Sequence, residues 1–547
     1  MGFKDISQWQ EGDWIAAICL GVLMIFLAAG GAIAARREPE ALGHPKGLYM
    51  LFFAEMWERF SYYGMRALLI FYLTQHWLFS DGKSNLIYGA YTSLVYITPV
   101  LGGYVADRYL GQRRAVLFGG ILLMIGHFLM AVEGTGGQND PTINVFWSAL
   151  AFIIVGSGFL KANISVMVGQ LYNLTDTRRD GAYTVFYMGI NVGAAIGTIL
   201  VGYLGQTIGW GYGFGLAGIG MLAGLIVFVL GRKALRGAGE APAPLSSARM
   251  WTLYGIGLAA VAVIWALVQY QDVIQTLLII SGLALLGYVV YEAFKLDRHA
   301  RDRIFAILFL IALNPLFWGL FEQAGGSINL YTDRFVDRGG VPASIFQSIN
   351  PIYIILLAPL FAGLWVALGK RGLEPSAPAK FGLALLQVGA GFLVFVWGAT
   401  MVGPAAMTPV IFVFLLYLLH TTGELCLSPV GLSAMARLAP RFMASLIMGA
   451  WFYMTAVGNF VAGKIGEATG GHTGEMTKEA TLGIYNQIGW VAVVIGVVVL
   501  GLSPFIKRLM HLDTLKDDDL AGRDELAEPQ AAGVHPEGET SPRPAGA

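Results

Sequence analysis

Long apolar runs alternate with short polar loops along most of this chain, and that pattern predicts a bundle of membrane-spanning helices. A run of about 20 apolar residues can cross the hydrocarbon core as a helix, and lipid offers no partners to an open backbone. The runs predict about fifteen such helices, at 14–35, 48–78, 86–106, 115–133, 143–171, 182–205, 212–231, 250–270, 274–295, 304–332, 343–369, 380–400, 409–435, 442–464 and 484–508. From residue 513 onward the sequence is acidic and rich in Pro and Gly, so a disordered tail is expected there.

Composition supports an all-α polytopic membrane protein. The 547 residues are 56% hydrophobic and only 13% charged, too few charges for the surface of a soluble protein of this length. The net charge is zero, so no nucleic-acid partner is expected. Cys19 and Cys426 both lie in apolar runs, and no Cys/His cluster, P-loop or GxSxG motif occurs. We therefore expect no enzyme, no metal and no cofactor.

Loop cations predict the orientation. Most of the loop Lys and Arg fall in alternate loops, at 36–46, 107–114, 172–181, 232–249, 295–303, 370–380 and 436–441. By the positive-inside rule these loops are cytoplasmic, which places the N-terminus outside and the C-terminus inside. Arg36 and Arg37 follow the first apolar run instead of preceding it, so a retained helix is favoured over a cleaved signal peptide.

Several ionisable residues fall well inside the predicted helices. Each such charge costs about 2.5–3.5 kcal/mol at the centre of a membrane helix, so these positions mark substrate or proton paths. The set holds three cations and four acids: Arg59, Arg66, Lys161, Glu55, Glu58, Glu322 and Glu424.

The stretch EMWERFSYYGMR, residues 55–66, holds four of these charges within twelve residues. Positions 55, 58/59, 62 and 66 recur at helical spacing, which aligns Glu55, Glu58 or Arg59, Tyr62 and Arg66. A purely structural ion-pair stripe is the alternative for Glu58 and Arg59. It does not account for Arg66, because neither residue 62 nor residue 70 is acidic.

The other buried charges need partners from elsewhere in the fold. Lys161 has no acid within one turn, so another helix or a ligand must supply its partner. Glu322 is a candidate counter-ion for either lone cation, Arg66 or Lys161. Glu424 has His420 one turn before it, so a plain Glu–His pair is the alternative to a functional role.

Six motifs in order along the chain resemble those of the proton-dependent oligopeptide transporters, a branch of the major facilitator superfamily. They are EMWERFSYYG (55–64), GGYVADRYLGQRR (102–114), GFLKANIS (158–165), FYMGINVG (186–193), FWGLFEQAGGS (317–327) and GELCLSPVGLSAMARLAP (423–440). Ala162 stands where many members have proline, and the helix at 14–35 departs from the family's usual fourteen.

The resemblance implies a major facilitator fold of two six-helix bundles that rock around a midplane site. Bacterial members carry two extra helices between the halves, which matches 250–270 and 274–295. The expected domains are 1–46 (extra N-terminal helix and linker), 47–231 (first bundle), 232–303 (linker with two helices), 304–512 (second bundle) and 513–547 (tail).

The resemblance also implies residue roles. Glu55, Glu58 and Arg59 are expected to couple protons, with Glu322 as a switchable partner of Lys161. Arg66 and Lys161 are expected to receive a peptide carboxylate, and Glu424 a peptide ammonium. Seven further residues are expected to line the cavity: Tyr62, Tyr63, Tyr96, Asn191, Asn350, Ser428 and Trp451.

These roles predict a monomeric, proton-driven importer of di- and tripeptides in the bacterial cytoplasmic membrane. Protons serve as the coupling ion. The nearest alternative keeps the fold and carries nitrate, a modified peptide or another organic anion. A membrane sensor whose buried charges are purely structural is a further alternative.

Overall fold

The computed structural model describes residues 22, 26, 40–173, 176, 178–471 and 473–514. Apart from Val22 and Phe26, the predicted helix at 14–35 lies outside the described residues, and so does the tail beyond residue 514. The described chain is almost entirely helical, which confirms the all-α prediction.

The long helices run in sequence order from one half of the molecule to the other. The first half holds α2 (Lys46–Phe71), α3 (Asp81–Val105), α4 (Gln112–Met130), α5 (Ile143–Gln170), α6 (Arg179–Thr207) and α7 (Trp210–Gly231). The middle holds α8 (Ser247–Val268) and α9 (Gln271–Ala293). The second half holds α10 (Arg298–Phe321), α11 (Ser327–Phe335), α12 (Ile349–Gly369), α13 (Ala377–Met401), α14 (Ile411–Leu438), α15 (Ala444–Thr469) and α16 (Lys478–Leu509).

Short elements link these helices. A hairpin of two-residue strands, β1 (Glu40–Ala41) and β2 (His44–Pro45), precedes α2, and β3 (Val336–Asp337) pairs in parallel with β4 (Thr408–Pro409). Single π-helical turns extend α2 over Tyr72–His76 and α3 over Ala106–Leu110. Turns of 3₁₀ helix lie at Arg232–Leu235, Glu322–Gly325, Ala343–Ser348, Arg441–Met443 and Leu512–Thr514.

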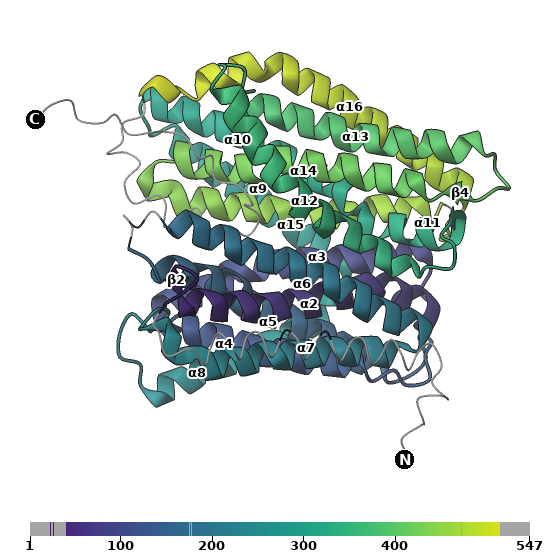
Figure 1. The fold of residues 1–547 in the computed structure, drawn as a ribbon, viewed down its shortest axis with the longest axis horizontal. Helices are drawn as coiled ribbons and strands as arrows, with labels where there is room; N and C mark the ends of the chain where they lie inside the picture. Colours follow the sequence, from purple (N-terminus) through teal and green to yellow (C-terminus); the bar gives the residue numbers. More distant parts are fainter. Residues whose placement is uncertain are drawn as a thin grey trace, which may run out of the picture.

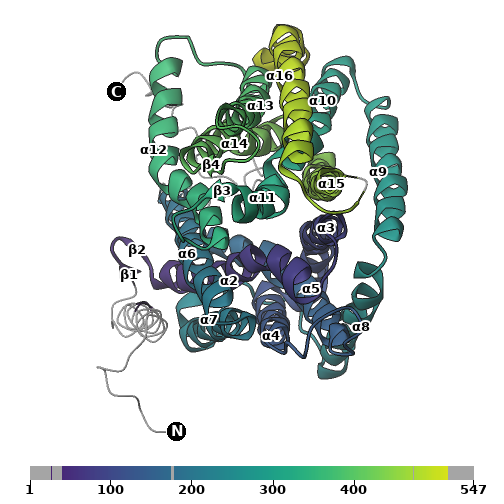
Figure 2. The same cartoon turned by 90° about the vertical axis from the view of Figure 1, so that its right-hand side faces the viewer.

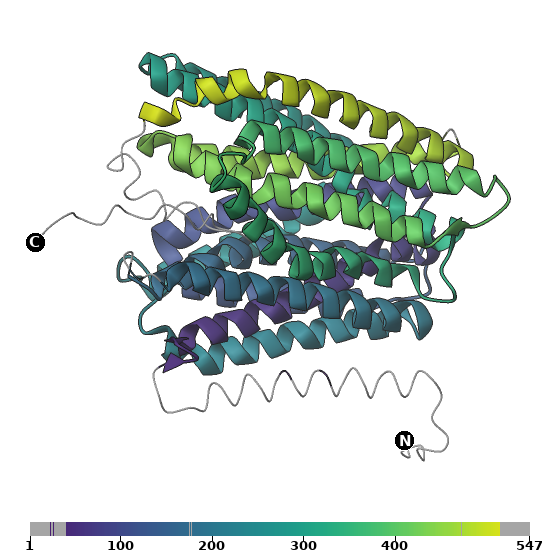
Figure 3. The same ribbon diagram turned by 45° about the horizontal axis from the view of Figure 1, so that its top comes forward.

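The two halves stack against each other with their helices roughly parallel (Figures 1 and 3). They meet where α3 packs on α15 and α6 packs on α12. Viewed end-on, α8 lies beside the first half and α9 beside the second (Figure 2). This is the predicted arrangement of two six-helix bundles with two extra helices. The exact domain limits stay a prediction.

Small residues let the helices come close. A Cβ atom on Gly89 of α3 would lie 2.6 Å from the Cα of Gly463 in α15, so a larger residue would push the two halves apart. Within the first half, Gly193 and Gly197 of α6 lie directly against carbonyl oxygens of α2. Close backbone approach at small residues is how membrane helices gain packing energy where lipid supplies little hydrophobic drive.

Thirteen helical segments among the described residues are long and apolar enough to cross a membrane by length and composition. The charged helix α2 is not among them, yet it is 26 residues long and buried within the first half. The predicted spans match the helices to within a few residues at most ends. The predicted span at 304–332 lies within one candidate membrane span, Arg298–Phe335, but the helix is interrupted, which the apolar run did not indicate. It consists of α10, a 3₁₀ turn at Glu322–Gly325 and α11, because Gly326 leaves helical geometry at φ −110° and ψ −102°.

Candidate functional site

A cavity lies between the two halves and is lined by residues from both. It encloses about 1030 Å³ of space, part of it open to solvent. The first half contributes residues from α2, α3 and α6, and the second half contributes residues from α10, α12, α14 and α15. Nine of the predicted site residues line it: Tyr63, Arg66, Tyr96, Asn191, Glu322, Asn350, Glu424, Ser428 and Trp451.

Arg66 on α2 finds its partner in the opposite half. Its guanidinium donates to the carboxylate of Glu322, at the break between α10 and α11, and its Nε donates to the Tyr88 hydroxyl at 2.5 Å. Arg66 is 7% exposed and Glu322 5%. This ion pair therefore joins the halves across the cavity.

Lys161 on α5 is not paired with Glu322 in this structure, contrary to the pairing that the resemblance suggested. Its Nζ lies 4.6 Å and 4.5 Å from the ring centroids of Tyr62 and Tyr96. Within the described chain, the ammonium has no hydrogen-bond partner. Lys161 and Tyr62 do not line the cavity in this conformation, whereas Tyr96 does.

Glu55, Glu58 and Arg59 form a buried cluster on α2, outside the cavity lining. Arg59 contacts Glu55 through Nη2 at 2.6 Å and through Nε at 2.7 Å, and its Nε lies 3.2 Å from Glu58. Both acids are fully buried. Arg59 therefore holds Glu55 more firmly than Glu58.

Glu424 on α14 is held by amide and hydroxyl groups of the second half. Asn350 on α12 donates from Nδ2 to Glu424 Oε2 at 3.0 Å and to the Thr421 hydroxyl at 3.0 Å. His420 lies beside Phe392, with ring centroids 4.9 Å apart and ring planes tilted by 60°. The Glu–His pair that the sequence left open is thus not formed among the described residues.

Other cavity residues were missed by sequence reasoning. Tyr187, Ala194 and Thr198 continue the helix face of Asn191 on α6, so helical spacing from the FYMGINVG motif could have found them. Trp318, Phe321 and Tyr417 also line the cavity. Aromatic residues occur throughout membrane proteins, so nothing in the sequence marked these three.

The two halves are also joined at the end where the cation-poor loops lie. Asp81, at the start of α3, accepts two hydrogen bonds from Arg334 of α11, at 2.5 Å and 2.6 Å, and one from the Met476 N–H at 2.6 Å. Asn329 of α11 donates to the Ala67 carbonyl of α2 at 3.2 Å. These contacts hold the halves together at this end.

The side chains of α3 become more exposed toward the cation-rich end. Most residues from 81 to 95 are buried, whereas Leu101 and Tyr104 are 66% and 56% exposed. The halves are therefore in contact at the cation-poor end, and α3 is more exposed toward the cation-rich end.

We expect Asp81→Asn to loosen the closed end. Asp81 is almost fully buried and Arg334 about one-third exposed, so the lost charge-assisted bonds are worth about 1.5–3 kcal/mol. A cysteine placed at Gln347, which lines the cavity, should then react faster with a membrane-impermeant maleimide added at the cation-poor side. Asp272→Asn, an exposed acid at the start of α9, is the control. An unchanged labelling rate in Asp81→Asn would mean that this junction is not a latch.

Comparison with known proteins agrees with the motifs. The model of the POT family matches residues 113–491. The chain is 38% identical over 486 residues to the uncharacterized transporter YclF of Bacillus subtilis, covering 86% of this chain and 95% of that protein. It is also 38% identical over 502 residues to the peptide transporter YePEPT of Yersinia enterocolitica, covering 86% of this chain and 96% of that protein.

Solved structures share the fold. A crystal structure of a peptide transporter POT in complex with sulfate superposes with a TM-score of 0.75 at 34% identity, covering 88% of this chain and 99% of that one. A POT family transporter in complex with a thioalcohol-conjugated peptide gives a TM-score of 0.74 at 33% identity, covering 87% and 99%. The two-half architecture, the cavity between the halves and these matches together show that the chain belongs to the POT family of membrane transporters.

Proposed function

We propose that this protein is a proton-coupled symporter that imports di- and tripeptides by alternating access. The observation that carries the proposal is the placement of Arg66 and Glu424, from opposite halves, in one cavity. A short peptide is a zwitterion with a carboxylate at one end and an ammonium at the other. Arg66 suits the carboxylate and Glu424 the ammonium, and the aromatic lining tolerates varied side chains.

Charge balance suggests why protons accompany the peptide. When all seven buried groups are ionised, the four acids outnumber the three cations by one. A zwitterion leaves that excess unchanged, so one bound proton brings the site to neutrality. We expect the neutral, loaded state to be the one that reorients, since an uncompensated charge in a closing site is costly.

The proposed orientation places the cation-rich loops and the C-terminus in the bacterial cytoplasm. The structure, whose halves are in contact at the cation-poor end, then corresponds to a state that is closed toward the outside. An inward-negative membrane potential supplies about 2.3 kcal/mol per charge per 100 mV to each proton that enters. We propose a monomer that uses no cofactor other than protons.

Uptake by reconstituted vesicles tests the function. Purified protein in proteoliposomes should accumulate labelled dialanine and trialanine when the outside is more acidic than the lumen, and should only equilibrate them without a gradient. The same vesicles treated with a proton ionophore are the control. An absence of acid-driven uptake of both peptides would overturn the proposal.

Glu424→Gln is expected to weaken recognition of a free peptide N-terminus. Loss of a charge-assisted contact worth about 1.5–3 kcal/mol lowers affinity by about 10- to 100-fold. Competition against labelled dialanine measures this. N-acetyl-dialanine, which lacks the ammonium, is the matched ligand control. Its affinity should differ far less between the variant and the parent protein. An equal loss for both ligands would show that Glu424 does not read the N-terminus.

The alternative cargo is nitrate, a modified peptide or an organic anion other than a peptide. Glu424 argues against nitrate and other anions without an amine, because a part-buried carboxylate facing the cavity favours an amine-bearing substrate. Competition between dialanine and nitrate for uptake separates the two. Displacement by nitrate at concentrations where dialanine is ineffective would support the anion carrier.

A further inference from the structure

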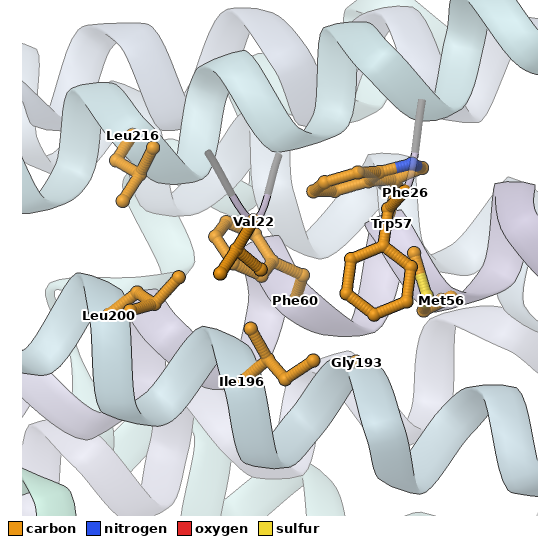
Figure 4. A pocket seen from close by; sticks show the side chains of 9 residues that line it. All are labelled: Val22, Phe26, Met56, Trp57, Phe60, Gly193, Ile196, Leu200 and Leu216. Carbon is orange, nitrogen blue, oxygen red and sulfur yellow. The ribbon is translucent and has the colours of Figure 1, made fainter. Parts of the chain in front are cut away.

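The first half presents an uncharged groove near the middle of its helices and a cluster of arginines at the cation-rich end. Figure 4 shows the groove, whose lining includes Trp57 of α2, Ile196 of α6 and Leu216 of α7, and none of its lining residues carries a charge. It shares no lining residue with the central cavity. Hydrocarbon favours uncharged side chains, whereas cations and aromatic rings gather at the level of the lipid headgroups. The arginine cluster is therefore a candidate contact with headgroups.

Helix α8 marks where the hydrocarbon region begins. Its exposed side chains are apolar from Trp251 onward and include Ile256 and Val263, which face lipid in a membrane transporter. Ser246 caps the helix by accepting a hydrogen bond from the Arg249 N–H at 3.3 Å, and the side chain of Arg249 is exposed. The exposed surface of α8 thus changes from cationic to aromatic and then to aliphatic within its first turns, which is the order of residues across a membrane interface.

A chain of ring contacts connects Arg249 to a second arginine at the end of α3. The Arg249 guanidinium carbon lies 5.0 Å from the centroid of the Tyr109 ring, and the Tyr109 and Tyr104 centroids are 6.5 Å apart. The guanidinium carbon of Arg108 lies 5.8 Å from the Tyr104 centroid. Arg108 is exposed, and Tyr104 is 56% exposed. Two arginines and two tyrosines therefore form one surface that runs from α3 to α8.

A third arginine joins this surface from α4. Arg114 is exposed and lies one turn before Phe118, so the two side chains share a helix face. The Phe118 ring stacks on Tyr254 of α8, with centroids 4.7 Å apart and planes at 24°. Trp251 meets the same Tyr254 ring at 5.8 Å and 81°. Arg114 is therefore on the side of α4 that faces α8.

The three arginines have no acidic partners. Within the described chain none of them forms an ion pair with a carboxylate. The acids of the neighbouring loops are held by other residues, since Asp107 accepts a hydrogen bond from Gln112 Nε2 at 2.7 Å and Glu240 lies 3.4 Å from Arg113. The cluster therefore carries more positive than negative charge, and an anion can approach it.

We propose that Arg108, Arg114 and Arg249, with the aromatic rings between them, bind the headgroup of an anionic phospholipid. A guanidinium group presents several N–H donors in one plane, which suits the oxygens of a phosphate. The exposed apolar side chains of α8 that follow Trp251 give the acyl chains of a lipid a surface to lie along, and a soluble anion gains nothing from them. A bound headgroup joins α3, α4 and α8. None of these residues lines the central cavity, so the site is separate from the proposed peptide site.

Native mass spectrometry of the full chain in detergent tests the site. The protein is titrated with palmitoyl-oleoyl phosphatidylglycerol or with phosphatidylcholine of the same acyl chains, and it should bind the anionic lipid more tightly. Each cation near an anionic surface contributes about fivefold in affinity, so replacing all three arginines with glutamine should weaken phosphatidylglycerol binding by about 100-fold. Binding of phosphatidylcholine should stay unchanged. The matched control replaces three exposed cations elsewhere at the cation-rich end, Arg298, Lys370 and Arg371, with glutamine and should keep the preference.

Three results would overturn the proposal: no preference for phosphatidylglycerol in the parent protein, an equal loss of binding in both triple variants, or displacement of the lipid by millimolar glycerol phosphate. The last result would identify a site for a soluble anion. A second measurement shows whether the variants are folded. Phosphatidylglycerol should raise the thermal unfolding midpoint of the parent and of the control variant more than phosphatidylcholine does, and the arginine variant should lose this difference. An equal rise in all three proteins would contradict binding at this cluster.

Discussion

Glu58→Gln is expected to abolish accumulation of dialanine against its gradient while peptide exchange across the membrane continues. Glu58 is fully buried, and its only ion-pair contact among the described residues is with Arg59 at 3.2 Å, whereas Arg59 holds Glu55 at 2.6 Å. The proposed coupling role requires the Glu58 side chain to carry a proton during the transport cycle. Glutamine keeps the shape of that side chain and cannot carry the proton.

The measurement compares two modes in the same proteoliposomes: uptake driven by an imposed pH difference, and exchange of labelled for unlabelled peptide without one. Glu292→Gln removes an acid that pairs with Lys295 near the surface and serves as the control, with both modes retained. Normal acid-driven accumulation in Glu58→Gln would remove Glu58 from the coupling mechanism.

Separating Arg66 from Glu322 is expected to have the largest effect on stability. Both residues are nearly buried, and removal of one partner from a buried ion pair costs about 3–5 kcal/mol because the other charge is left uncompensated. Arg66→Gln and Glu322→Gln should each unfold at much lower temperature and lose uptake. The double variant, with no charge left over, should recover most of the stability and still not transport.

Thermal unfolding in detergent, arranged as a double-mutant cycle, measures this coupling. The surface pair Lys464–Glu467, at 2.9 Å with both side chains more than a third exposed, is the control and should couple by less than about 1 kcal/mol. A similarly small coupling for Arg66 and Glu322 would mean that their contact is incidental. Recovery of uptake in the double variant would remove Arg66 from peptide recognition.

Much of the fold could be predicted because membrane helices can be recognised from their apolar composition. Each apolar run had to be a helix, and the helix bounds follow the runs closely. The break after Phe321 escaped prediction, because a pair of glycines in an apolar run is equally compatible with a straight helix. The structure shows the break at Gly326, whose backbone lies against the Asn85 side chain of α3.

The contacts of the candidate site were likewise predictable only in part. The Glu55–Arg59 pair follows from its spacing of four residues, which sets two side chains together on any helix. Arg66 meets Glu322 across 256 positions of sequence, so only the packing of the two halves could decide which cation Glu322 contacts. Lys161 rests on two tyrosine rings, and nothing in its own helix indicates that arrangement.

The linker helices α8 and α9 carry a mechanical consequence for the transport cycle. Gln269 and Tyr270 alone connect them, at the end where the halves are closed, while α8 packs on α5 and α9 on α15. Two residues span about 7 Å at most, so they form a short connection between the two halves at the cation-poor end. When the halves separate at that end, α8 must slide along α5 or α9 must slide along α15. Distances between spin labels on either pair of helices would record the displacement. The length of this connection thus limits how far the two halves can separate at the cation-poor end.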